Sequence, residues 1–315
     1  GFFLTQRLHK FITKVWSTRT IPQQWKDANV VTIFKRNDDR QICGNSRGIS
    51  LLSVAGKVLA RVMLCRLLAH VVDVVAPESQ CGFRQGRSTI DMISVARLLQ
   101  EKCREKHQNL FLAFIEITKA FDTVNRDLLW RVLGKFGCPP TFLKVLEEFH
   151  AGMKARVVVA GRQSDPFDIT VGVKQGCVLA PVILNLFLVA VTIVFRNNLE
   201  PNAGISINYR LDGSLFNIRR LKAETKVCRG RLFELQYADD AAIAAHTEDS
   251  LQSALNLLAG AYNRAGLNIN AKKTEVLSCA AQPMPALPTF SVTGVRCLSV
   301  RSSYTLAAHC PTAAI

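Results

Sequence analysis

The segment with the clearest chemical potential is Tyr237-Ala238-Asp239-Asp240, which places two adjacent carboxylates between apolar stretches of the 315-residue chain. Ionised neighbours repel each other, and each loses hydration when it is buried. A bound divalent cation reverses that penalty, because Mg²⁺ prefers carboxylate oxygens together with substrate phosphates. A solvated hairpin turn is the alternative interpretation, because Asp is common in turns.

A third carboxylate, Glu116, stands near the end of the apolar stretch at residues 110–117. If that stretch is a strand beside the Asp239-Asp240 turn, the three acids could hold two divalent ions. Such ions activate an attacking hydroxyl and stabilise a leaving phosphate. A lone strand acid is more often a rim residue, so Glu116 does not decide the matter by itself.

The charge balance indicates an anionic partner. The chain has 40 Lys and Arg against 24 Asp and Glu, which gives a net charge of +16. Residues 1–70 hold 12 of the basic residues and only 3 acids. Such an excess favours binding to an anionic polymer or surface. The loop Gly172-Val173-Lys174-Gln175-Gly176 could let the backbone approach nucleic acid closely, because glycine carries no side chain.

The elements that must position these residues follow from periodicity and turn signals. Strands are predicted at residues 25–34 and 110–117, two short strands turned near Gly161 at 157–169, and a strand–turn–strand at 233–245. Helices are predicted at residues 57–75, 89–106, 127–136 and 251–265, and the chain after Pro283 is weakly patterned. The regular βαβ rhythm of a parallel sheet is missing, so the pattern predicts an α+β fold with helices on one face of an antiparallel sheet.

Residues 178–195 form an apolar run at the lower length limit for a transmembrane helix. Pro181 and Asn185 interrupt it, and we favour a buried core helix and no membrane. The ten cysteines include no Cys-x-x-Cys pair, which indicates reduced thiols of an intracellular protein, nuclear or cytoplasmic. No signal peptide is seen, although residues 3–16 could form either a targeting helix or a packed amphipathic helix. The start at Gly1 indicates a fragment.

Six segments, in order along the chain, resemble the reverse transcriptases of LINE-type, non-long-terminal-repeat retrotransposons. They are Asn45-Ser46-Arg47-Gly48-Ile49-Ser50-Leu51-Leu52, Gln80-Cys81-Gly82-Phe83-Arg84, Thr118-Lys119-Ala120-Phe121-Asp122, Gly172-Val173-Lys174-Gln175-Gly176-Cys177 with Pro181, Tyr237-Ala238-Asp239-Asp240, and Gly266-Leu267-Asn268-Ile269-Asn270 with Lys272-Lys273-Thr274. The resemblance runs from about Trp25 to Thr274. Any one segment is soft support, whereas six in the right order are strong.

The resemblance implies a right-hand polymerase fold with fingers, a palm built on an antiparallel sheet, and a thumb. The implied divisions are fingers at 1–110, palm at 111–133 and 171–280, a fingers–palm connection at 134–170, and a truncated or diverged thumb at 281–315. The implied partners are an RNA template, a DNA primer and deoxynucleoside triphosphates, with Mg²⁺ or Mn²⁺ as cofactor. No obligate protein partner is implied.

The resemblance also implies roles for single residues around the metal. Asp239 would be the principal metal ligand with Asp240 beside it, and Glu116 would occupy the position of the family's first catalytic carboxylate. Lys273 would lie near the triphosphate and is a candidate proton donor to the leaving pyrophosphate.

A second group would bind the nucleotide and template. Phe121 would be the steric gate that fills the space of a ribose 2′-OH. Arg47 would contact the triphosphate, and Gln175 and Gly176 would lie near the template and incoming base.

Two departures from the family pattern matter. The family has Asp where this chain has Glu116, and the extra methylene moves the carboxylate by about one C–C bond; a displacement near 1 Å can lower a rate by roughly 10²-fold. We therefore expect impaired catalysis. The tail around Val300-Arg301-Ser302-Ser303-Tyr304 does not continue into the family's thumb sequence, which predicts poor processivity. A non-catalytic nucleic-acid-binding relic is the competing hypothesis.

Overall fold

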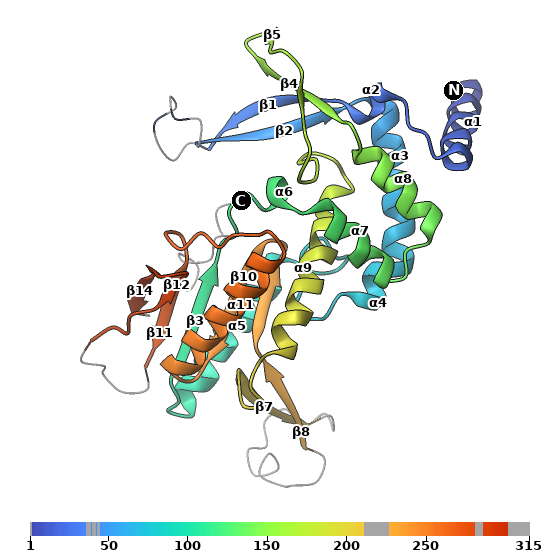
Figure 1. Ribbon diagram of the computed structural model, residues 1–315. Helices are drawn as coiled ribbons and strands as arrows, with labels where there is room; N and C mark the ends of the chain where they lie inside the picture. Colours follow the sequence, from blue (N-terminus) through green and yellow to red (C-terminus); the bar gives the residue numbers. More distant parts are fainter. Residues whose placement is uncertain are drawn as a thin grey trace. The chain divides into compact units, whose positions relative to one another are not determined.

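The computed structural model describes residues 2–35, 39, 42, 45–210, 227–280 and 286–301 (Figure 1). The chain divides into two compact units. The first unit contains Gly1–Pro77, Lys119–Ala190 and Ala265–Leu267, and the second contains Glu78–Thr118, Val191–Arg264 and Asn268–Ile315. Each unit has its own five-stranded sheet.

The sheet of the first unit is built on a long antiparallel pair, β1 (Ala28–Phe34) and β2 (Ser46–Leu52). β4 (Lys154–Val159) pairs with β1 in parallel and carries the short strands β5 (Arg162–Gln163) and β6 (Phe167–Asp168). The expected strand at 25–34 begins later, because Gln23–Lys26 forms the helical turn α2 after Pro22. The strand β2 was not foreseen. Most of the expected loop at 35–45 lies outside the described residues.

Helices make up most of the rest of the first unit. They are α1 (Phe2–Thr18), α3 (Val54–Leu67), η2 (Leu68–Val72), α4 (Asp73–Val75), α6 (Ala120–Thr123), α7 (Arg126–Lys135) and α8 (Pro140–His150). The expected helix at 57–75 begins earlier, at Val54, because the Ser53 side chain accepts a hydrogen bond from Gly56 N at 3.2 Å and so caps it. The π-helical turn η2 interrupts it. α7 starts one residue before the prediction, with the Asn125 side chain as its cap.

The sheet of the second unit has the strand order β14-β11-β3-β10-β9. Its members are β3 (Leu110–Ile115), β9 (Glu234–Tyr237), β10 (Asp240–Ala245), β11 (Glu275–Cys279) and β14 (Leu298–Arg301). All neighbours pair antiparallel except β11 and β14, which are parallel. The predicted strand at 110–117 and the predicted strand–turn–strand at 233–245 are therefore confirmed.

Both faces of the central strand β3 are buried, because every residue from Leu110 to Ile115 is at most 5% exposed. On one face, Leu110, Leu112 and Phe114 pack in a cluster with residues of α5 (Thr89–Glu105). Helix α11 (Glu248–Arg264) contacts β3 and β10. The predicted α+β fold, with helices packed on an antiparallel sheet, is therefore confirmed.

Three further features of the second unit have no counterpart among the sequence-based predictions. β7 (Ile205–Arg210) pairs with β8 (Val227–Leu232), and β12 (Ser291–Val292) pairs with β13 (Val295–Arg296). In the weakly patterned tail, Phe290 is buried with its ring 6.1 Å from that of Phe111. Thus part of the predicted thumb packs on the sheet, while residues 281–285 and 302–315 lie outside the described residues.

Helix α9 (Ala180–Asn197) is long and apolar enough to cross a membrane when judged by length and composition alone. Its mean hydropathy is 1.8, and 67% of it is buried inside the protein. Core helices of soluble proteins have the same properties. The structure therefore agrees with the predicted buried helix.

Candidate active site

The two adjacent carboxylates lie at the turn between β9 and β10 in the second unit. Tyr237 and Asp240 form the last cross-strand pair, so Ala238 and Asp239 make the turn itself. Ala238 has a φ of 57°, in the left-handed region that residues other than glycine seldom adopt. Asp239 and Asp240 are both half-buried. The tight turn thus presents the pair at the end of the sheet.

Glu116 follows β3, the strand next to β10. The register of these strands ends at Ala241 opposite Ile115, so the next step along both strands places Asp240 opposite Glu116. Residues directly opposite in an antiparallel pair share one face of the sheet. The structure therefore brings the end of the Glu116 strand to the Asp239-Asp240 turn, as the sequence predicted.

The Glu116 side chain is held by Lys273. Lys273 Nζ lies 2.7 Å from Glu116 Oε1, and the backbone N–H of Asn270 donates to the Glu116 carbonyl at 2.8 Å. An antiparallel bridge between Ile117 and Ile269 aligns the two segments. The Lys273 and Glu116 side chains are 58% and 30% exposed, and an ion pair so open to water contributes less than about 1 kcal/mol. A substrate or metal ion could therefore displace it.

The donor chemistry of the turn suits a divalent metal only in part. Asp239 and Asp240 offer the carboxylate oxygens that Mg²⁺ prefers. Among the described residues, however, no group of three or more His, Cys, Asp or Glu is arranged to hold a metal ion. Glu116 would have to leave Lys273 to become the third ligand. The aspartate pair would thus offer two of the ligands of a divalent ion, and its role as the metal site stays a prediction.

Gln80 fixes the turn that carries the aspartates. It is fully buried, its Nε2 donates to Ala238 O at 3.2 Å, and its Oε1 accepts from Ala238 N at 3.0 Å. The same amide bonds to Gln236 Oε1 and to Gly82 N. The main-chain N–H of Cys81 also donates to Gln236 O at 2.9 Å and extends this contact. One side chain therefore satisfies both polar groups of the left-handed residue before Asp239.

Gly82 lies directly against the same turn. A Cβ at this position would stand 2.1 Å from Ala238 N and 2.7 Å from Ala238 Cα. Because both atoms belong to the backbone, neither can move aside like the end of a flexible side chain. Glycine is therefore required here for close approach. The sequence had marked this segment by resemblance but not the contact that explains it.

Replacing Gln80 by Leu is expected to lower the free energy of unfolding by on the order of 3 kcal/mol, because it leaves several buried polar groups without partners. Chemical denaturation measures the change. Gln85→Leu is the matched control, because Gln85 is an exposed glutamine of the same segment. Equal unfolding midpoints for the two variants would contradict the assigned role of Gln80.

A partly buried ion pair joins Arg196 of α9 to Glu234 of β9 at the base of the hairpin. Arg196 donates through Nε to Glu234 Oε1 at 2.8 Å and through Nη2 to Ser79 Oγ at 2.6 Å. Glu234 is 2% exposed. Burial, together with the charges of Glu234 and then Asp239, raises the pKa of the Tyr262 hydroxyl, so Tyr262 stays neutral. The base of the hairpin is therefore held by hydrogen bonds from Arg196 to Glu234 and Ser79.

The residues predicted to bind nucleotide and template all belong to the first unit. Arg47 is exposed on β2, opposite Ile33 of β1. Phe121 is half-buried in α6, and its carbonyl accepts from Val173 N at 2.7 Å. Phe121 is thus tied through its main chain to the loop that carries Gln175 and Gly176.

That loop is also bonded to β2. The Gln175 carbonyl accepts from Ser50 N at 2.7 Å. Gly176 has a φ of +108°, and a Cβ there would stand 2.6 Å from Ser50 O, so no other residue fits without strain. The structure therefore links Phe121, Gln175, Gly176 and the strand of Arg47 within one unit.

The sequence order of these elements matches a known family. Residues 33–301 match the family model of the reverse transcriptase (RNA-dependent DNA polymerase). The chain belongs to the reverse transcriptase family. This membership confirms the resemblance on which the site residues were chosen, and enzymes of the family generally use divalent metal ions. The roles of the individual residues stay predictions.

The relatives of this reverse transcriptase chain include proteins of mobile elements. It is 32% identical over 170 residues to the probable RNA-directed DNA polymerase from transposon BS of Drosophila melanogaster, covering 53% of this chain and 18% of that protein. It is 31% identical over 168 residues to the RNA-directed DNA polymerase from mobile element jockey of the same species, with the same coverage. It is 24% identical over 273 residues to the Pol polyprotein of retrotransposable element R2 of Popillia japonica, covering 85% of this chain and 34% of the relative. The reverse transcriptase chain thus spans a fifth to a third of these relatives.

Solved structures confirm the right-hand polymerase fold. The apo telomerase of Candida tropicalis, truncated from its C-terminal domain, superposes with a TM-score of 0.53 at 14% identity, covering 91% of this chain and 58% of the telomerase. A second Candida tropicalis telomerase structure, in complex with a fragment of telomeric RNA, gives a TM-score of 0.54 at 12% identity, covering 91% of this chain and 47% of that one. At this identity the likeness concerns the fold alone. The predicted boundaries of fingers, palm and thumb stay predictions.

Proposed function

We propose that the chain is an RNA-directed DNA polymerase domain that adds deoxynucleotides to a DNA primer on an RNA template inside the cell, in the nucleus or cytoplasm. The observation that carries the proposal is the pairing of Ala241 with Ile115, which leaves Asp240 and Glu116 next to each other in register at the same end of the second sheet. Family membership over residues 33–301 supports the same reaction.

Asp239 and Asp240 would hold Mg²⁺ or Mn²⁺, with Glu116 as the third carboxylate once it is released from Lys273. Two such ions, when bound, would activate the primer hydroxyl and stabilise the charge on the leaving pyrophosphate. Lys273 would then be free to approach the triphosphate, where an ammonium can neutralise charge or donate a proton. Gln80 would keep Asp239 in place by fixing Ala238.

Phe121 would select deoxynucleotides, because its ring would occupy the space of a ribose 2′-OH. Arg47 would bind the triphosphate through its guanidinium, which pairs well with phosphate oxygens. Gln175 and Gly176 would lie along the template and incoming base. These assignments rest on the family resemblance and on the main-chain bonds that join the Gly172–Gly176 loop to Phe121 and to Ser50 of β2.

A non-catalytic nucleic-acid-binding relic is the second candidate function. The ion pair between Glu116 and Lys273 favours it, because that pair occupies a carboxylate that the reaction needs. The net charge of +16 would support nucleic-acid binding without chemistry.

Primer extension on an RNA template tests the proposal. The chain should extend the primer only with a divalent cation present, and EDTA should stop it. Template–primer binding, measured by fluorescence anisotropy, should weaken steeply with salt, because basic side chains displace counterions from phosphates. Salt-sensitive binding without extension in this chain and in Glu116→Asp would support the relic, and a folded chain that binds no template–primer would contradict both.

A further inference from the structure

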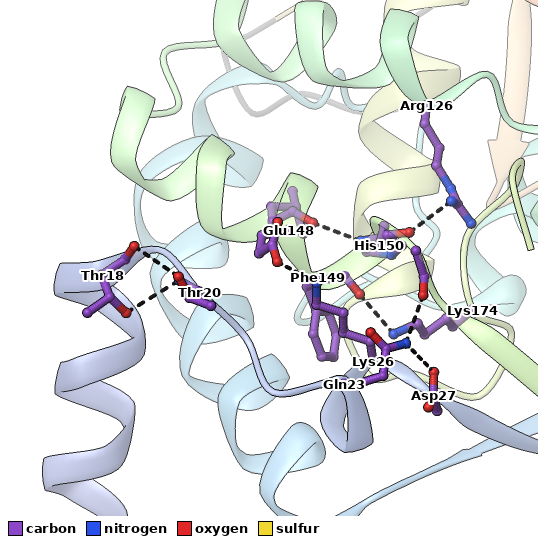
Figure 2. A network of polar contacts seen from close by, with 12 residues as sticks. Thr18, Thr20, Gln23, Lys26, Asp27, Arg126, Glu148, Phe149, His150 and Lys174 are labelled. Carbon is purple, nitrogen blue, oxygen red and sulfur yellow. Dashed lines mark hydrogen bonds and ion pairs between the residues drawn. The ribbon is translucent and has the colours of Figure 1, made fainter.

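Two buried lysines, Lys26 and Lys174, and the half-buried Arg126 gather at the carboxyl end of α8 in the first unit. Figure 2 shows Arg126 and Lys174 directed at this helix end, with Lys26 paired to Glu148 beside them. The last carbonyls of a helix have no intrahelical partner, and the helix dipole makes this end attractive to cations. The open carbonyl oxygens at this end can therefore accept hydrogen bonds from cationic side chains.

Arg126, the first residue of α7, joins three segments through carbonyl oxygens. Its Nη1 donates to His150 O at 2.9 Å and to Ile169 O at 3.0 Å. Its Nε donates to Gly172 O at 2.7 Å, and its Nη2 donates to Val171 O at 3.1 Å. The planar guanidinium thus bonds the end of α8 to the start of the Gly172–Gly176 loop.

Lys174 makes a second connection from the same loop to the same helix end. It is 2% exposed, its Nζ donates to Phe149 O at 3.0 Å, and it lies 4.0 Å from the centre of the Phe149 ring. A cation over an aromatic face is attracted by the ring electrons. Arg126 and Lys174 together form the carbonyl clamp of the loop.

The clamped loop contacts the residues predicted to select the nucleotide. Gly172 N donates to Val124 O at 3.0 Å, and Val173 N donates to Phe121 O at 2.7 Å. On the other side, Ser50 N of β2 donates to Gln175 O. A shift of the loop would therefore move the Phe121 main chain and the strand of Arg47.

The clamp is electrostatically unfavourable for Lys174. Burial, then the nearby Arg126 and Lys26, lower its pKa to about 7, while Cys177 and Asp27 act in the opposite direction. Burial also lowers the pKa of Arg126. His150, which faces Lys174, has its pKa lowered to about 3, mainly by burial, and stays neutral. A buried ammonium that is disfavoured in this way is poorly explained as a stabilising group.

The geometry points to Arg126 and Lys174 as positioning residues that hold the Gly172–Gly176 loop and, through it, set the discrimination between deoxynucleotides and ribonucleotides. This inference rests on the proposed polymerase function. Neither residue touches the reacting atoms in this assignment, so both act through Phe121, Gln175 and Ser50.

Hydrogen exchange in the substrate-free protein tests the mechanical part without any catalysis. Lys174→Met and Arg126→Lys should each speed exchange in peptides containing Ser50 and Val173 by about tenfold, because the loop opens more often. Lys144→Met and Arg131→Lys are the controls, since both residues are exposed on α8 and α7. Unchanged exchange in both clamp variants would overturn the inference.

Single-nucleotide incorporation tests the functional part, in this chain or, if it is inactive, in the Glu116→Asp background. The clamp variants should lower the ratio of kcat/KM for a deoxynucleotide to kcat/KM for the matching ribonucleotide by about tenfold. A small displacement of Phe121, the proposed gate, is sufficient for such a change. The effect should fall mainly on KM. Faster hydrogen exchange with an unchanged kcat/KM ratio would overturn the role of the clamp in nucleotide selection. A complete lack of primer extension, both in this chain and in Glu116→Asp, would contradict the proposed function. The hydrogen-exchange result alone would then test whether Arg126 and Lys174 hold the loop.

The pH dependence of the free energy of unfolding distinguishes a positioning role of Lys174 from a role in stabilising the fold. Between pH 7 and the ordinary lysine pKa of 10.5, the unfolded chain binds the Lys174 proton and the folded chain does not, so stability should rise with pH in that window. Lys174→Met should remove this rise and should not lower the denaturation midpoint at pH 7. A lower midpoint with an unchanged nucleotide ratio would assign Lys174 to the fold alone.

Discussion

Glu116→Asp is expected to raise primer extension by about 100-fold, because it withdraws one methylene and returns the carboxylate to the reach that the family uses. The same change draws the carboxylate away from Lys273, whose Nζ now lies 2.7 Å from Glu116 Oε1. Both effects should raise the rate of primer extension. The released carboxylate becomes available to bind metal, and the released Lys273 ammonium becomes available to bind the triphosphate.

The measurement is the rate of single-nucleotide addition on an RNA template at saturating Mg²⁺. Glu101→Asp is the matched control, because Glu101 is an exposed glutamate on α5 of the same unit. A gain for Glu116→Asp alone would establish this chain as an impaired polymerase. Equal rates for the two variants would show that Glu116 does not limit the reaction.

Asp239→Asn is expected to lower the rate of primer extension by more than about 100-fold in whichever background is active. Loss of a residue that only hydrogen-bonds to a metal ligand lowers activity by about 10- to 100-fold, and loss of a ligand itself should cost more. The amide keeps the size of the side chain and removes its charge, so the turn held by Gln80 should persist. Template–primer binding should change little, since the turn carries no basic residue.

Asp249→Asn, an exposed aspartate in the first turn of α11, controls for the loss of one negative charge. Binding of Mn²⁺, followed by water-proton relaxation, gives a second reading that does not depend on turnover. If Asp239→Asn kept both Mn²⁺ binding and extension, the assignment of the metal site to this turn would be wrong.

The ion pair between Glu116 and Lys273 connects the two candidate functions. In the substrate-free protein it neutralises an acid that would otherwise face the Asp239-Asp240 turn. Because the pair is open to water, its contribution to stability is small, less than about 1 kcal/mol. Whether the chain is a slow enzyme or a relic therefore depends on whether substrate and metal together outcompete Lys273.

The candidate site was largely predictable because its signals are local. Alternating apolar residues and a compact turn place Asp239 and Asp240 at a hairpin, and a continuous apolar run places Glu116 at a strand end. Such periodicity follows from side chains alternating across a strand, which needs no knowledge of distant residues. Gly82 was marked by the family resemblance and Gly176 by its glycine-bearing loop, although what approaches them was unknown.

The sequence by itself determined the hairpin, the central strand and the order of motifs that identifies the family. Only the tertiary structure decided that Lys273 binds Glu116 across 157 positions, that Gln80 holds Ala238, and that Arg126 and Lys174 bind the end of α8. Most of these partners are main-chain groups, which every residue carries, so no residue type records them in the sequence. The strand β14 was not predicted for a related reason. A short edge strand is stabilised by pairing with its neighbour, here β11, more than by the alternation of its own side chains.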